Sequence, residues 1–436
     1  MDDSTTIHFV NHASYLQRYK KTRLLVDPWI SGDAFHHGWS LLAPTASSPA
    51  VLNNPTHIWV SHEHPDHFAP ASFKSIPQER REQITVVYQK TKDRKVVKFI
   101  EQLGYSVIEP TNGEWVKLGD IEALIEEVPL NDSLLVTRTG ETTIVNMNDC
   151  THMSRADLRR LRQRLPRVDV LFTQFGYASW QGAPDGTALR KELAKAQLDR
   201  ITTQVEALQP TYVVPFASFI YFSAEENDYL NDANNKVADA HEHLRKLGVK
   251  PVVMYPGDEW QVGEPHDSSS ALKRWAERYD VPKTRYQAAS VPVEKLKELA
   301  DQYSSRMLEF HSPRMIRVLS MMRLGFFGPI SIYLADHQCS VEFSLFNGLK
   351  TTDGRRDQCE VSMHSESLEF LLKFDYGLNT MSVNGRFVSD TRGFKRLVRA
   401  FGLGSLKNDG RRFGPDLLMD RSIWGAASRA FLQRRS

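Results

Sequence analysis

Cysteine is scarce in this chain and widely scattered. The 436 residues include only three cysteines, Cys150, Cys339 and Cys359. Three distant thiols cannot form a disulfide framework, so the sequence favours a reducing compartment and we expect a cytoplasmic protein. The same scarcity argues against an iron–sulfur cluster, because such clusters need several Cys or His ligands at close spacing.

Long apolar runs and an excess of one charge are absent as well. No stretch approaches the ~20 consecutive apolar residues of a membrane-spanning helix. The acidic start, residues 1–4, lacks the apolar segment of a secretory signal. The 55 Lys and Arg are nearly balanced by 53 Asp and Glu. We therefore expect no membrane span and no nucleic-acid partner.

The chain is long enough for two domains and ends in a basic tail. Its 436 residues exceed what one hydrophobic core usually supports, and 41% hydrophobic with 25% charged residues is typical of a globular protein. The polar segment 264–270 predicts a boundary between domains 1–264 and 271–436. Residues 391–436 carry eleven Lys or Arg and three Asp. We interpret them as a solvated basic tail or a helix face, with contact to an acidic partner or a phosphate-bearing substrate as the alternative.

Potential metal ligands are concentrated in one short segment. His62, His64, Asp66 and His67 lie within six residues, directly after the apolar run 58–60. In an extended segment alternate side chains point to one side, so His62 and His64 can bind one metal ion. The chain then turns, and Asp66 and His67 can face a second ion. The alternative, a His-rich polar surface turn, accounts less well for this spacing.

Motifs elsewhere in the chain resemble the metallo-β-lactamase superfamily. That family has a strand followed by a G/N-H-A-S element, a second strand ending in Asp-Pro, and an H-x-H-x-D-H segment. The corresponding residues here are 11–14, 27–28 and 62–67. The resemblance implies an α/β fold, a metallo-β-lactamase-like αβ/βα sandwich of four layers.

A narrower resemblance is to the metallo-β-lactamase-like part of CMP-N-acetylneuraminate hydroxylases. Their motifs D-P-W-L-x-G-x-A-F, G-W-W-L-L, N-x-x-D-C-T and P-F-A-G-Y resemble segments 27–35, 38–42, 146–151 and 215–217, in the same order. The resemblance covers residues 5–262. Those hydroxylases carry a Rieske domain ahead of this part, and this sequence shows no counterpart to it.

Hydrophobic periodicity predicts the remaining elements. Residues 89–103 and 187–208 have helical patterns in the first domain. Strand-like alternation at 330–334, 338–345 and 359–363 predicts a smaller C-terminal α+β domain with the basic tail. We compare this domain with sterol-carrier-protein-like folds.

The resemblance also implies a ligand set for two metal ions. His62 and His64 would bind the first ion, and Asp66 and His67 the second. Asp149 follows an apolar run and stands where the superfamily has its bridging carboxylate. Asp66 and Asp149 are also the expected catalytic carboxylates.

A third histidine that normally completes the first site is missing. It would belong in the loop 126–133, which contains no histidine. Asp132 is the predicted replacement and metal ligand, with Glu127 as the runner-up. A turn aspartate that caps a backbone N–H is the alternative interpretation of Asp132.

The last histidine of the superfamily is also missing. It should fall near 215–218, where Ala217 stands. Oxygen ligands from residues 225–227 could take its place. His12 and Glu63 are expected near the metals, where they would orient the ligands.

The exchange of histidines for carboxylates favours iron over zinc. Zinc with neutral imidazoles suits hydrolysis, whereas an oxygen-richer site with open positions suits iron and O₂. We expect a non-haem iron oxygenase or hydroxylase with one or two iron ions, acting on a small-molecule or nucleotide-linked substrate. A ferredoxin or reductase would supply its electrons. The alternatives are a hydrolase of phosphoester, amide or thioester bonds with Zn or Mn, and a binding protein whose second site is degenerate.

Overall fold

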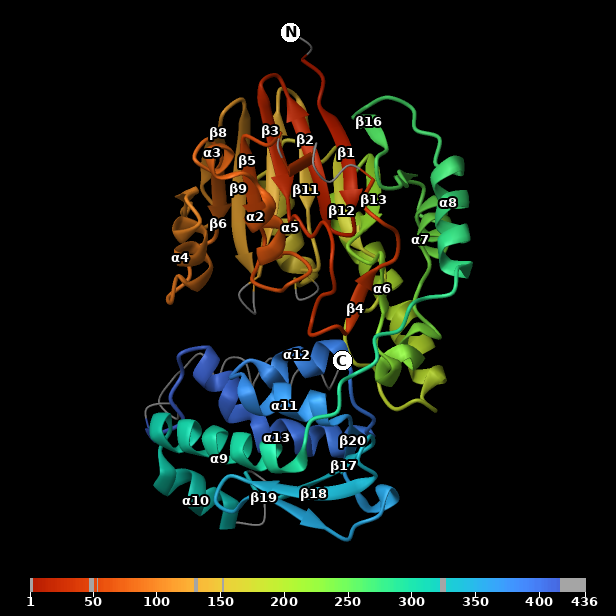
Figure 1. Ribbon diagram of the computed structural model, residues 1–436. Helices are drawn as coiled ribbons and strands as arrows, with labels where there is room; N and C mark the ends of the chain where they lie inside the picture. Colours follow the sequence, from red (N-terminus) through yellow and green to blue (C-terminus); the bar gives the residue numbers. More distant parts are fainter. Residues whose placement is uncertain are drawn as a thin grey trace. The chain divides into compact units, whose positions relative to one another are not determined.

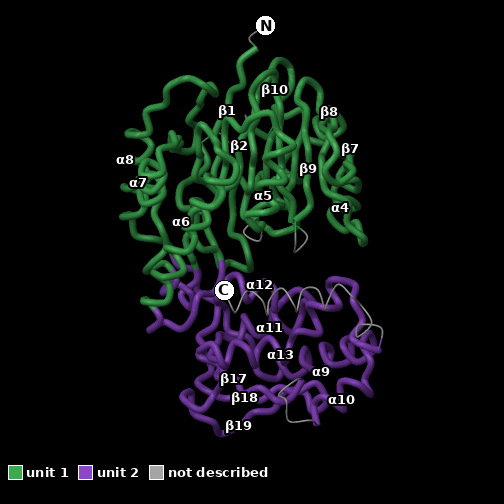
Figure 2. The backbone as a smooth tube through the Cα atoms, turned by 180° about the vertical axis from the view of Figure 1, so that it is seen from behind, with its two compact units in different colours: residues 1–178, 187–223, 231–284 green, residues 179–186, 224–230, 285–436 purple. Residues whose placement is uncertain are grey.

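The chain folds into two compact units, which Figure 2 colours separately. The computed structural model describes residues 3–46, 51–52, 54–128, 132–150, 153–321 and 327–415. The first unit consists of Met1–Ala178, Thr187–Ser223 and Asn231–Thr284. The second consists of Ser179–Gly186, Ala224–Leu230 and Arg285–Ser436. All the predicted metal ligands fall in the first unit.

One sheet of the first unit carries the strands that lead to most of these ligands (Figure 1). Its order is β16-β1-β2-β3-β5-β6-β7. β2 is antiparallel to both β1 and β3, and β3, β5, β6 and β7 are parallel. The carboxyl ends of β1, β3 and β5 therefore lie at the same edge. The strands are β1 (Thr6–Asn11), β2 (Ser14–Tyr19), β3 (Thr22–Val26), β5 (His57–Val60), β6 (Thr85–Tyr88), β7 (Ser106–Ile108) and β16 (Glu259–Gln261).

The second sheet has the order β15-β13-β12-β11-β10-β9-β8. β11, β12, β13 and β15 are parallel, while β10 is antiparallel to β11 and β9. The start of β10 therefore lies beside the end of β11. The strands are β8 (Trp115–Leu118), β9 (Ile121–Val128), β10 (Asp132–Thr139), β11 (Thr142–Asn146), β12 (Val170–Gln174), β13 (Tyr212–Phe216) and β15 (Lys250–Pro251).

The two sheets pack face to face and helices cover their outer faces, which is the αβ/βα sandwich expected from the sequence (Figure 1). Between the sheets, the ring of Tyr15 stacks on Phe172 with centroids 4.4 Å apart. Phe73 and Val97 are buried under the helices that cover the first sheet. The helices are α2 (Pro70–Ser75), α3 (Gln78–Arg81), α4 (Lys95–Gln102), α5 (Arg155–Gln163), α6 (Thr187–Leu208), α7 (Val237–Lys246) and α8 (Ser269–Asp280), and the short strands β4 (Trp39–Leu41) and β14 (Ile220–Phe222) pair with each other.

The long helix α6 spans the predicted residues, whereas α4 starts later than predicted. α4 begins at Lys95, not near residue 89. The Gln89 side chain donates from Nε2 to the Ser61 carbonyl at 3.2 Å. Arg94 then takes a left-handed φ of 51°, which a continuing helix does not allow. The apolar periodicity of residues 89–103 therefore predicted a helix correctly only for the second half of that segment.

The units divide after Thr284, later than the predicted boundary at 264–271. The intervening helix α8 belongs to the core of the first unit. Its Trp275 is fully buried, donates from Nε1 to the Met254 carbonyl at 2.9 Å, and stacks on Phe219 with centroids 4.0 Å apart. The polar segment 264–270 thus lies within the first unit, and its last two residues begin α8.

The second unit has the predicted α+β composition. Its sheet has the order β19-β18-β17-β20 and packs against α9, α11 and α13. β19 was not predicted, because its last three residues are exposed and lack apolar alternation. The elements are α9 (Val293–Phe310), α10 (Pro313–Met321), β17 (Ile330–Leu334), β18 (Cys339–Ser344), β19 (Gly348–Thr352), β20 (Val361–Met363), α11 (Ser365–Lys373), α12 (Gly377–Asn384) and α13 (Thr391–Asn408), with 3₁₀ turns η1 (Glu225–Asn231) and η2 (Arg356–Gln358).

The first part of the predicted basic tail is a packed helix. α13 buries Leu397, Phe401 and Leu403 in the core of the second unit. Residues 416–436 of the tail lie outside the described residues. Among the helices that the structure describes, none has both the length and the hydropathy to cross a bilayer.

Candidate metal centre

The predicted metal ligands lie in loops that follow strands of both sheets. His12 comes directly after β1, residues 62–67 follow β5, and Asp149 follows β11. Two of these loops are tight, because His12 and Asn148 have φ values of 43° and 52°. Such left-handed conformations are uncommon for residues other than glycine and cluster at functional sites.

His62, His64 and Asp149 form one group of potential ligand atoms. Each offers one atom, and these atoms lie within 4.8 Å of one another. His62 Nε2 is 2.8 Å from His64 Nδ1 and 3.8 Å from Asp149 Oδ2. Atoms at this spacing can surround one ion at the distance of about 2 Å that is usual for nitrogen and oxygen ligands.

His12, Asp66 and His67 form a second group, and all three are buried. Asp66 Oδ2 lies 3.1 Å from His67 Nε2 and 3.3 Å from His12 Nε2. The sequence predicted Asp66 and His67 here but gave His12 only an orienting role. Its ring nitrogen instead faces the same space as the other two side chains. A histidine placed directly after a buried strand was the signal that could have identified it.

His12 also lies beside the position where the last histidine of the superfamily was expected. That position is Ala217, whose backbone N–H donates to the His12 carbonyl at 2.9 Å. Ala217 itself has a left-handed φ of 54°. The backbone at 217 therefore approaches the centre as expected, and an imidazole reaches the same region from β1.

Asp149 connects the two groups. Its Oδ2 atom is 3.8 Å from both His62 Nε2 and His67 Nε2. Among the described residues, the Oδ1 atoms of Asp149 and Asp66 are buried without a hydrogen-bond partner. Buried carboxylate oxygens are costly unless they are paired or bind a cation. These oxygens fit a centre that holds metal.

Asp27 binds His67 of the second group through the ring nitrogen that faces away from the other ligands. It is fully buried at the end of β3 and accepts a hydrogen bond from His67 Nδ1 at 3.0 Å. It also accepts from the Ser61 backbone N–H at 2.8 Å and the Ser61 hydroxyl at 2.9 Å. The bond at Nδ1 leaves Nε2 of His67 for the centre. The sequence motif contained Asp27, but we assigned it no role.

Asp132 lies beside His62 rather than within either group. Its Oδ1 is 3.1 Å from His62 Nδ1, the ring nitrogen opposite the one that faces His64. Its Oδ2 accepts from the Cys150 thiol at 3.3 Å. Asp132 is therefore close to the centre, as predicted, but its contacts are those of a residue that orients a ligand.

The charges at the centre are strongly coupled. Burial disfavours a charged His62, but the Asp132 and Asp149 carboxylates outweigh it and raise the pKa of His62 to about 9. Burial and the neighbouring His62 lower the pKa of His64 to about 4. Burial opposes ionisation of Asp66, yet His67 holds its pKa well below the usual range. The lowered pKa of Asp66 favours its charged carboxylate, and a cation can compensate this charge in place of a proton.

Other predicted residues are engaged elsewhere. Glu226 pairs with Arg386 at 3.0 Å, and the Asn227 amide donates to the Asn384 carbonyl at 2.6 Å. These contacts all lie within the second unit. Neither Glu226 nor Asn227 belongs to the two groups of potential ligand atoms among the described residues. Glu63 is exposed and belongs to neither group.

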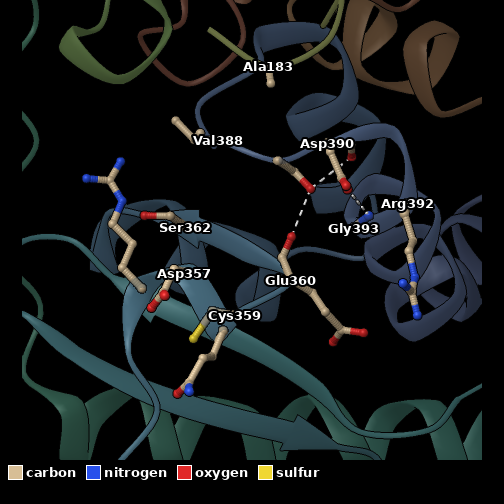
Figure 3. A pocket seen from close by; sticks show the side chains of 12 residues that line it. Ala183, Asp357, Cys359, Glu360, Ser362, Val388, Asp390, Arg392 and Gly393 are labelled. Atoms are coloured by element: carbon tan, nitrogen blue, oxygen red, sulfur yellow. Dashed lines mark hydrogen bonds between the residues drawn. The ribbon is translucent and has the colours of Figure 1, made fainter. Parts of the chain in front are cut away.

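A polar hollow of about 460 Å³ lies in the second unit (Figure 3). The Ser389 hydroxyl donates to the Glu360 carbonyl at 2.9 Å, and the Gly393 N–H donates to Asp390 Oδ1 at 2.7 Å. Figure 3 shows these bonds around the first turn of α13. The polar groups hold the start of that helix, so the metal centre is the stronger candidate for function.

Comparisons with known proteins point to one superfamily. The profile of the β-lactamase superfamily domain matches residues 6–217. The cytidine monophosphate-N-acetylneuraminic acid hydroxylase of Danio rerio is 26% identical over 275 residues, which are 58% of this chain and 44% of that protein. The chain spans less than half the length of the curated relatives it matches.

Two solved structures illustrate the range of its neighbours. CmlA, a diiron β-hydroxylase from Streptomyces venezuelae, is 15% identical and matches 60% of this chain and 55% of its own, with a TM-score of 0.41. Igni18, a metallo hydrolase from the archaeon Ignicoccus hospitalis, is 13% identical and matches 60% of this chain and 100% of its own, with a TM-score of 0.43.

Proposed function

Since residues 6–217 match the profile of the β-lactamase superfamily domain and the first unit has a metallo-β-lactamase fold, we propose that the chain is a non-haem iron oxygenase, in particular a hydroxylase. Two ions would bind, one to His62, His64 and Asp149 and the other to His12, Asp66 and His67. Asp149 would bridge them. The substrate class is a small molecule or a nucleotide-linked molecule.

The donor set is the observation that carries this proposal. Each group contains two histidines and one carboxylate. Two histidines and one carboxylate with open positions are the ligands of many non-haem iron oxygenases. Bound iron would supply the reaction with O₂. The 26% identity to a hydroxylase over this part of the chain supports the same choice.

The surrounding residues would keep the ligands in place. Asp27 fixes the tautomer and direction of His67 through Nδ1, and Asp132 does the same for His62. Burial of His12 lowers its pKa and keeps its imidazole in the neutral form that binds metal. The three scattered cysteines offer no cluster ligand set, so electrons would come from a separate ferredoxin or reductase.

A zinc- or manganese-dependent hydrolase is the second candidate. Two histidines and a carboxylate also form the ligand set of several catalytic zinc sites, with water in the fourth position. The four histidines of the centre favour this alternative more than the sequence alone did, because His12 adds a nitrogen donor.

Metal content tests the proposed site. The protein is purified from iron-supplemented cells and analysed for metals, together with His64→Ala, Asp66→Ala and the control His241→Ala, a half-buried histidine of α7 outside both ligand groups. We expect iron with visible absorption in the wild type and in the control, and loss of metal in the two site variants. Full occupancy in both site variants would contradict the assignment. Zinc in place of iron would favour the hydrolase.

A further inference from the structure

An apolar groove crosses the surface of the second unit, between α10 and α13. Its volume is about 710 Å³, within the ~300–1,000 Å³ that is usual for small-molecule pockets. Almost all of its lining is apolar. The lining residues are Arg314, Met315, Val318, Leu319, Phe327, Val398, Arg399, Gly402, Leu406 and Phe413.

Large apolar side chains are exposed at this groove. Val318 of α10 and Val398 of α13 line the groove and are 55% and 40% exposed. Single exposed apolar residues are common, but a contiguous apolar groove marks a binding surface. Burying these side chains against a ligand would be favourable.

Gly402 lines the groove and faces open space. It lies within α13, where glycine destabilises a helix by ~1 kcal/mol relative to alanine. Two residues further on, a Cβ at Gly404 would meet the Asp375 carbonyl at 2.7 Å, so packing requires that glycine. At Gly402 an added Cβ would meet nothing within 4 Å. Packing within the unit therefore leaves open space above Gly402, and only a side chain much larger than a methyl group would fill it.

The two helices that border the groove are basic, although Arg396 of α13 pairs with Glu360 and Lys407 pairs with Asp375. α10 and α13 carry seven Lys or Arg and no Asp or Glu. Arg314 and Arg399 are the charged residues of the lining. An apolar groove with guanidinium groups at its side suits a molecule with an apolar chain and an anionic end, because arginine pairs well with carboxylate and phosphate.

We propose that this groove between α10 and α13 binds a single amphiphile with a hydrocarbon chain and a carboxylate or phosphate end. The chain lies over Gly402 between Val318 and Val398, and the anionic end meets Arg314. This site is separate from the metal centre and does not depend on its metal.

Charge also makes an anionic amphiphile a better occupant of the groove than the C-terminal end of this chain. Residues 416–436 contain apolar side chains, but they carry four Arg against two Asp. A basic segment is a poor match for a basic groove, whereas an anionic amphiphile is a good one. The concave form of the groove suits one hydrocarbon chain better than the flat surface of a bilayer.

Displacement of a fluorescent fatty acid by palmitate from the full-length protein tests the proposal. We expect saturable binding of one palmitate per chain. Gly402→Phe fills the groove and should weaken palmitate binding at least 10-fold, while the matched control Gly402→Ala should bind like the wild type. Equal binding by Gly402→Phe, with unchanged folding by circular dichroism, would overturn the proposal.

A second variant tests the anionic end. Arg314→Glu should weaken palmitate at least 10-fold and leave hexadecanol, which has the same chain and no charge, unchanged. An equal loss for both ligands would overturn the assigned role of Arg314. Three other outcomes would overturn the proposal. Binding only to anionic phosphatidylglycerol vesicles would show that the groove docks on a bilayer, and a dimer that Gly402→Phe abolishes would show that it binds a second copy of the chain. Palmitate binding only after truncation behind Pro415 would show that the C-terminal tail occupies the groove.

Discussion

At the scale of single residues, His12 is the side chain whose role changed most between sequence and structure. Sequence motifs placed it near the metals, and its Nε2 atom lies 3.3 Å from Asp66 Oδ2. It also neighbours Ala217, where a histidine is missing. His12 can therefore complete the group of Asp66 and His67, for which the sequence predicted no further histidine ligand.

The variant His12→Ala should lose the ion of the second group and keep that of the first. Removal of one ligand leaves only Asp66 and His67 in that group, whereas His62, His64 and Asp149 are untouched. Elemental analysis measures the change. His241→Ala, a half-buried histidine of α7 outside both ligand groups, is the control and should keep the full metal content. If His12→Ala keeps the metal content of the wild type, His12 is not a metal ligand and only orients its neighbours.

Asp132 can be tested as an orienting residue or as a ligand. If it orients His62 through Nδ1, Asp132→Ala should lower metal affinity ~10–100-fold, and Asp132→Asn should recover much of it, because the amide oxygen still accepts the hydrogen bond. A metal ligand would not be rescued in this way. Competition with a chromophoric chelator gives the affinities. An equal loss of metal affinity in Asp132→Asn and Asp132→Ala would favour direct ligation of the metal by Asp132.

Asp27 should matter for stability even without metal. Its carboxylate accepts three hydrogen bonds in a fully buried site. Asp27→Ala would leave the buried His67 and Ser61 groups unpaired, and we expect a loss of about 3–5 kcal/mol in unfolding free energy. Urea denaturation of the metal-free protein measures it, with the exposed Asp280→Ala as control. A loss below ~0.5 kcal/mol, which is usual for surface positions, would show that Asp27 does not support the fold.

At the scale of secondary-structure elements, α8 decides where the first unit ends. Trp275→Ala removes a fully buried indole that packs on Phe219, and should destabilise the first unit by about 3–5 kcal/mol. Lys273→Ala, on the exposed face of the same helix, should have little effect. Hydrogen exchange resolves the two units. Faster exchange confined to the second unit would contradict the position of α8.

The sequence predicted elements best where periodicity was strong and local. α6 spans the expected residues 187–208, and the motif loops after β5 and β11 bring His62 and Asp149 together as predicted. The start of α4 and the place of α8 depended on contacts with distant residues, such as Gln89 with Ser61 and Trp275 with Met254. Contacts of this kind cannot be inferred from spacing along one chain.

In the candidate site, too, local features could be predicted from the sequence, whereas contacts between distant residues could not. Ligands within the segment 62–67 follow from an extended backbone and a turn. The contributions of His12 and Asp27 required the strand order, because β1, β3 and β5 end at one edge only once the sheet is formed. The side on which Asp132 meets His62 depended on a ring orientation that no sequence pattern specifies.

At the scale of the whole molecule, the chain combines a metallo-β-lactamase-fold unit with an α+β unit that has its own core. The metal centre lies within the first unit, and the apolar groove lies within the second. Each can therefore be tested in the full-length protein without disturbing the other.

The central claim is that the metal centre performs iron-dependent chemistry with O₂. The most direct measurement is O₂ consumption by metal-free protein reloaded with Fe(II) or Zn(II), with a chemical reductant, beside His64→Ala and the control His241→Ala. We predict that the iron form of the wild type and the control consumes O₂ with a change in visible absorption, and that the zinc form and His64→Ala do not. An iron form that is inert toward O₂, together with a zinc form that cleaves a phosphoester or thioester, would contradict the claim.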